Sequence, residues 1–125
     1  MSAVTVVREL HAAYARAADR SRSGDKTPFH ANHLPLLTAA LPEAVVVHVI
    51  RDPRSVAAAF RSVSWATDDA HAAGRAWRRH VANARGAGAV LGAERYLEIR
   101  YEELVADPVP SLRRLCAALG LGYTD

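Results

Sequence analysis

Arg51 stands at a point in the sequence where a positive charge could bind an anion. It follows the apolar, β-branched run VVVHVI (45–50) and precedes Asp52-Pro53, a strong helix start because aspartate caps free amides and proline loses no hydrogen bond there. In open α/β sheets, ligands lie beyond the carboxyl ends of the strands, against helix N-termini. We therefore expect free amides, a helix dipole and the guanidinium to face one anion. The alternative is that Arg51 pairs with Asp52 or with a neighbouring carboxylate.

Other side chains with reactive chemistry are few. Lys26 is the single lysine, and the remaining cationic side chains are arginines. The six histidines show no metal-ligand spacing, so no metal site is predicted. Cys116 occupies an apolar helical position, which favours a core residue over a nucleophile. One cysteine forms no internal disulfide, and this fits a reducing cytoplasm.

The elements that would position Arg51 alternate between helix and strand. Strands separated by helical crossovers indicate an α/β fold with parallel pairing. The run 45–50 is apolar on both faces apart from His48, which predicts a strand that is buried on both sides. Periodicity and capping signals predict strands at 45–50 and 95–101, and helices at 3–20, 32–42, 53–64, 69–91 and in a last segment that stops at Gly120.

Length and composition fit one small domain over residues 1–125, since 50% of the residues are hydrophobic. Two strands make a poor sheet, because stable sheets usually need about three or more strands or helix cover. We therefore expect a partial parallel sheet flanked by helices, in an incomplete domain. An open sheet edge would allow copies of the chain to associate.

Charge and hydropathy argue against two classes of partner. The net charge is +3, but no arginine-rich run interleaves with aromatic residues, so nucleic-acid binding is not predicted. No apolar run approaches the ~20 residues needed to cross a bilayer, and no signal segment is visible. The sequence therefore predicts a soluble protein that binds neither nucleic acid nor membrane.

Two long stretches of the chain resemble the middle and later parts of the sulfotransferases, which use 3′-phosphoadenosine 5′-phosphosulfate (PAPS). They are GDKTPFHANHLPLLTAALPEAVVVHVIRDPRSVAAAF (24–60) and ERYLEIRYEELVADPVPSLRRLCAALGL (94–121). The resemblance implies a P-loop-like α/β fold and PAPS as the sulfuryl donor. It further implies that Arg51 binds the 3′-phosphate, that Tyr101 of YEEL lies near the adenine, and that Lys26 of KTP lies near the transferred sulfuryl group.

Two positions depart from the family pattern. A family serine eight residues after the arginine corresponds to Ala59 here, and Ser55 or Ser62, each about one turn away, could compensate. A histidine that some members use as general base, two residues after the lysine, corresponds to Pro28. His30 or His33 could serve as the base only by a shift in position.

The family's Gly/Ser/Thr-rich loop, which wraps the 5′-phosphosulfate with backbone amides, has no counterpart in the sequence. We therefore expect a fragment or a shortened member that shows no sulfuryl transfer alone. The function that the resemblance implies is sulfuryl transfer from PAPS to an acceptor hydroxyl or amine of a small molecule or carbohydrate. The alternative is a non-catalytic remnant that binds a nucleotide bisphosphate or a partner chain.

Overall fold

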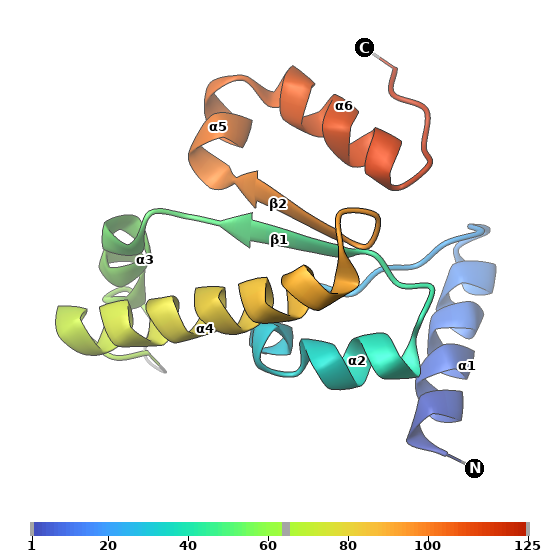
Figure 1. Ribbon diagram of the computed structural model, residues 1–125, viewed down its shortest axis with the longest axis horizontal. Coiled ribbons are helices and arrows are strands. Elements are labelled where there is room, and N and C mark those ends of the chain that lie inside the picture. Colours follow the sequence, from blue (N-terminus) through green and yellow to red (C-terminus); the bar gives the residue numbers. More distant parts are fainter. Residues whose placement is uncertain (1, 64–65, 125) are drawn as a thin grey trace. The chain divides into compact units, whose positions relative to one another are not determined.

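A computed structural model of the chain describes residues 2–63 and 66–124 (Figure 1). The chain divides into two compact units, Met1–Ala44 and Val45–Asp125. The prediction of a single domain over residues 1–125 stays a prediction. No helix in the described part of the chain is both long and apolar enough to cross a membrane.

The first unit is helical. Helix α1 (Ala3–Ala17) begins after Ser2, whose hydroxyl accepts the Thr5 N–H at 3.2 Å. Within this unit, Arg8 of α1 donates to the carbonyl oxygen of Ala40, the last residue of α2 (Leu34–Ala40), at 3.3 Å, and forms an ion pair with Glu43 just beyond it, at 2.8 Å. The predicted helices at 3–20 and 32–42 are therefore present with shifted ends: α1 (Ala3–Ala17), a 3-10 helix η1 (Pro28–Asn32) and α2 (Leu34–Ala40).

The second unit holds the sheet. Its elements are β1 (Val46–Ile50), α3 (Pro53–Phe60), α4 (Ala70–Leu91), β2 (Tyr96–Arg100), α5 (Tyr101–Ala106) and α6 (Pro108–Ala118). The two strands are parallel, and their register runs from the pair Val46↔Tyr96 to the pair Ile50↔Arg100. Helix α4 lies on one side of the sheet and α6 on the other (Figure 1). The predicted α/β class with a small parallel sheet and flanking helices is thus confirmed.

Three expectations about these elements need correction. The prediction that β1 is buried on both sides is wrong, because Val47 and Val49 are 36% and 51% exposed. Helix α3 ends at Phe60 rather than near Ser64, which lies outside the described residues. The second strand ends at Arg100 rather than at Tyr101, which begins the short helix α5; α6 then follows Asp107, whose backbone is extended (φ −146°) before Pro108. Proline disfavours a helical conformation in the residue that precedes it.

A polar network lies between β1, β2 and α4. His48 Nδ1 and the Tyr96 hydroxyl are 2.6 Å apart, and that hydroxyl donates to Glu98 Oε1 at 3.0 Å. Arg85 of α4 binds both oxygens of the Glu98 carboxylate, at 2.8 and 3.0 Å. Burial of the His48 imidazole lowers its pKa, although the Glu98 carboxylate opposes this shift. The polar groups on this face of the sheet are therefore paired with one another.

His48 should make the protein less stable in mild acid. Its pKa is lowered from 6.5 in the folded state, so the unfolded chain takes up the proton first and is stabilised relative to the folded state as the pH falls through that value. We expect the melting temperature to drop between pH about 7.5 and about 5.5. The drop should be smaller in His48→Gln, in which this position cannot titrate. Equal drops in the two proteins would assign the acid sensitivity to other groups, such as His80, whose pKa burial also lowers.

Candidate functional site

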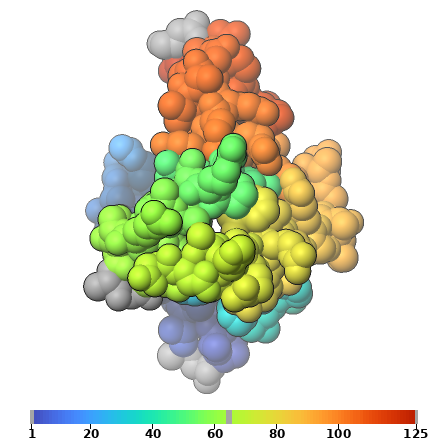
Figure 2. Space-filling model, turned by 90° about the vertical axis from the view of Figure 1, so that its left-hand side faces the viewer, coloured from blue at the N-terminus to red at the C-terminus, as the bar shows by residue number. Residues whose placement is uncertain are grey.

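Arg51 and Tyr101 meet at the carboxyl ends of the two strands. The register pairs Ile50 with Arg100, the last residues of β1 and β2. Arg51 and Tyr101, which follow them, therefore leave the sheet at the same edge. The Arg51 guanidinium carbon lies 4.9 Å from the centre of the Tyr101 ring, within the range of a cation–π interaction. Figure 2 faces this edge, and the segment after β1 (green) lies against the segment after β2 (orange). Two residues that are 50 positions apart thus form one surface site.

The Arg51 guanidinium has no carboxylate partner within the described ranges 2–63 and 66–124. Asp52, its predicted alternative partner, instead binds Arg54 through both oxygens, at 3.0 and 2.8 Å. These hydrogen bonds from Arg54 hold the pKa of the Asp52 carboxyl well below its usual range. The exposed Arg51 side chain is therefore available to an anion.

The expected free amides at the start of α3 are not free. The Asp52 carboxylate accepts the Arg54 N–H at 2.8 Å, and Glu102 accepts the Asp52 N–H at 2.8 Å. The Asp52 amide in turn lowers the pKa of the Glu102 carboxyl. Both amides are bound by the protein's own carboxylates, so this part of the sequence prediction is wrong. An anion here would depend on the guanidinium.

Glu102 and Trp77 are residues of this site that sequence reasoning missed. The Trp77 indole N–H donates to the Arg51 carbonyl oxygen at 2.9 Å, while Glu102 binds the amide on the other side of the same peptide group. Trp77 belongs to the apolar stripe of α4, and Glu102 is one of two adjacent glutamates in YEEL. Nothing in the local sequence indicates contacts that span 26 and 50 residues.

The two serines proposed to replace the missing hydroxyl at Ala59 lie at opposite ends of α3. Ser55 is in the first turn, four residues after Arg51, and is half-buried. Ser62 follows the helix, and its hydroxyl donates to the Ala59 carbonyl oxygen at 2.7 Å. An eight-residue helix is about 12 Å long. The two hydroxyls therefore cannot serve one phosphate together.

Lys26 and His30 belong to the first unit, whereas Arg51, Ser55, Ser62 and Tyr101 belong to the second. Lys26 is exposed in the segment before η1. His30 Nδ1 lies 3.3 Å from an Asp25 carboxylate oxygen, and the Thr27 hydroxyl donates to the same carboxylate at 3.1 Å. Asp25 thus lies beside Nδ1 of the His30 ring.

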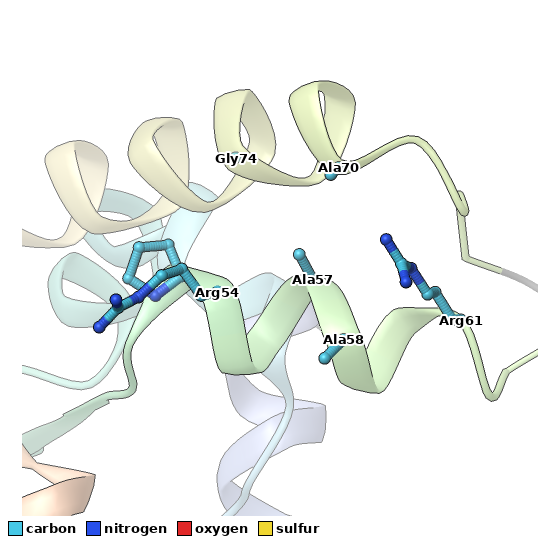
Figure 3. A pocket seen from close by; sticks show the side chains of 7 residues that line it. Arg54, Ala57, Ala58, Arg61, Ala70 and Gly74 are labelled. Atoms are coloured by element: carbon cyan, nitrogen blue, oxygen red, sulfur yellow. The ribbon is translucent and has the colours of Figure 1, made fainter.

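A shallow groove of about 420 Å³ lies between α3 and α4 (Figure 3). Its floor consists of small residues, and two arginines border it. Arg54 is already bound to Asp52 and its guanidinium points away from the groove, as Figure 3 shows. The lining residues are Pro53, Arg54, Ala57, Ala58, Arg61, Ala70 and Gly74. We assign the groove no ligand, because Arg61 alone offers it an available charge.

Within the described residues, no three His, Cys, Asp or Glu side chains gather as a metal site. Searches among curated proteins and among solved structures give no match. Comparison with protein families matches residues 3–125 to the sulfotransferase family. This match covers nearly all of both units, including the joint at Arg51 and the segment that begins at Tyr101. The chain belongs to the sulfotransferase family.

Proposed function

We propose that the protein binds PAPS, with Arg51 on the 3′-phosphate and Tyr101 beside the adenine. The observation that carries the proposal is the exposed Arg51 guanidinium, which lies on the Tyr101 ring without a carboxylate partner in the described part of the chain. A guanidinium can hold a phosphate through two parallel hydrogen bonds. Tyr101 is 38% exposed, and we propose that its ring is open in part to a planar base.

Of the two candidate serines, we propose that Ser55 is the better partner for the 3′-phosphate. It lies in the first turn of α3, at the same end of the helix as Arg51. Ser62 lies beyond the far end and already donates its hydroxyl proton to Ala59. To donate to a phosphate, the Ser62 hydroxyl would therefore have to break its hydrogen bond to the Ala59 carbonyl oxygen.

For the transfer step, we propose that His30 accepts the acceptor's proton and that Lys26 stabilises negative charge on the transferred group. PAPS supplies a sulfuryl group: the acceptor oxygen or nitrogen forms the new bond to sulfur as the S–O bond to the 5′-phosphate breaks. Adenosine 3′,5′-bisphosphate leaves with that electron pair. His30 would take the proton at Nε2, because Asp25 binds Nδ1. Positioning and electrostatics dominate transfers of this kind.

The proposed acceptor is a hydroxyl or amine of a small molecule or carbohydrate. The proposed location is the cytoplasm, which suits the free Cys116.

Two observations favour the alternative function, a non-catalytic domain that binds a nucleotide bisphosphate. Ala59 lacks the hydroxyl of the family pattern. In addition, the amides at the start of α3 are bound by carboxylates. Association of copies through the sheet edge remains a proposal that sedimentation can test.

Titration calorimetry on the purified protein tests the proposed donor site. We expect adenosine 3′,5′-bisphosphate to bind more tightly than adenosine 5′-monophosphate, because only the former carries the phosphate that Arg51 would bind. Equal affinities would contradict the proposal. Labelled PAPS incubated with phenols, sugars and amines then tests the expectation that this chain shows no sulfuryl transfer alone. A labelled product would contradict that expectation and support the transferase, whereas binding without product would agree with it.

A further inference from the structure

One peptide group at the proposed phosphate site is bound from two helices at once. The Arg51 carbonyl oxygen accepts the Trp77 indole N–H from α4 at 2.9 Å. The N–H of the same peptide, which belongs to Asp52, donates to Glu102 of α5 at 2.8 Å. Both polar groups of this peptide are therefore held by side chains outside the strand and the helix that it connects.

We propose that Glu102 and Trp77 are positioning residues for the Arg51 guanidinium. The inference rests on the proposed donor site. A peptide held at its oxygen and at its nitrogen cannot rotate without losing one of the two hydrogen bonds. The ψ angle of Arg51 is thereby restrained, and with it the direction in which its side chain leaves the backbone. Together with the contact on the Tyr101 ring, this restraint reduces the conformational freedom that is lost when the guanidinium binds a phosphate.

Glu102 has a second effect through its neighbour in the sequence. It directly follows Tyr101, so its hydrogen bond to Asp52 joins the segment after β2 to the segment after β1. This bond and the contact of Arg51 with Tyr101 link the two segments just beyond the last pair of the sheet, Ile50↔Arg100. One side chain thus helps to hold both the proposed phosphate residue and the proposed adenine residue.

Three variants and one control test the inference. Glu102→Ala removes the acceptor of the Asp52 N–H, Glu102→Gln keeps an oxygen that can accept it, and Trp77→Phe keeps a ring but removes the donor. Glu103→Ala is the matched control, because Glu103 carries the same charge in the same turn and, among the described residues, makes no hydrogen bond or ion pair with the joint. The readout is the ratio of affinities for adenosine 3′,5′-bisphosphate and adenosine 5′-monophosphate. We expect Glu102→Ala and Trp77→Phe to lower this ratio about 2- to 10-fold, and Glu102→Gln and Glu103→Ala to preserve it.

Hydrogen exchange at the Asp52 amide, followed by NMR, provides a readout that needs no nucleotide. Exchange should be faster in Glu102→Ala than in the wild type, and unchanged in Glu102→Gln and Glu103→Ala. Unchanged exchange in Glu102→Ala, or faster exchange with an unchanged affinity ratio, would overturn the positioning role.

Arg51→Ala serves as the reference for the affinity ratio. If this ratio falls in Arg51→Ala but not in Glu102→Ala, the positioning role alone is overturned. A ratio unaffected by Arg51→Ala overturns the proposed donor site itself and the positioning role with it.

Discussion

Replacement of Gly88 by alanine is expected to lower the free energy of unfolding by about 1–3 kcal/mol, although the same replacement at Gly86 should raise it by roughly 0.5–1 kcal/mol. Both glycines lie within α4, where alanine normally stabilises a helix. A Cβ at Gly88 would lie 2.5 Å from Cδ1 and 2.6 Å from Cε1 of the Tyr96 ring, whereas a Cβ at Gly86 would meet nothing within 4 Å. The first substitution therefore requires the ring or the helix to move.

The Tyr96 ring has little freedom to move, because its hydroxyl lies 2.6 Å from His48 Nδ1 and donates to Glu98 at 3.0 Å. A displaced ring would lose these partners, and a displaced α4 would strain the bonds from Arg85 to Glu98. Urea unfolding of the wild type and the two variants measures the effect, with Gly86→Ala as the matched control. A Gly88→Ala protein as stable as the wild type would show that α4 and the sheet separate at little cost.

The order of the elements could be predicted because their ends carry local signals. Asp52-Pro53 starts α3 and Asp69 caps α4, with its carboxylate accepting the His71 N–H at 2.8 Å. The apolar run before Arg51 forms β1 as expected. The exposure of Val47 and Val49 could not be predicted, because an apolar run indicates a strand but not what covers each face.

The candidate site was predictable where it depends on position along the chain. Arg51 and Tyr101 each follow a strand, and parallel strands end at the same edge, so their proximity follows from the pairing. The contacts that surround them depend on side chains far apart in sequence. Two such contacts are the hydrogen bond from the Asp52 amide to Glu102 and the hydrogen bond from the Trp77 indole to the Arg51 carbonyl oxygen. Asp25 lies only five residues before His30, but their contact could not be predicted either, because it depends on how the chain turns into η1.

Arg51→Ala is expected to weaken binding of adenosine 3′,5′-bisphosphate roughly 10- to 100-fold, since hydrogen bonds to charged groups contribute about 1.5–3 kcal/mol. Binding of adenosine 5′-monophosphate should change much less, so the preference for the bisphosphate is lost. The expected loss is large because the amides of Asp52 and Arg54 are bound by carboxylates and cannot replace the guanidinium. Arg51→Lys should recover only part of the preference, because an ammonium group lacks the planar pair of donors and stacks less well on Tyr101.

Ala59→Ser should tighten binding of the bisphosphate by roughly 0.5–1.5 kcal/mol, because it restores the hydroxyl of the family pattern. Ala58→Ser is its matched control, since Ala58 is also exposed on α3 but lies about 100° away around the helix axis. Titration calorimetry of these proteins at one ionic strength measures the differences, because the binding of phosphate to an exposed arginine weakens with added salt. Equal gains in the two serine variants would place the phosphate away from Ala59. A preference unchanged in Arg51→Ala would remove Arg51 from the donor site and assign its guanidinium to the contact with the Tyr101 ring.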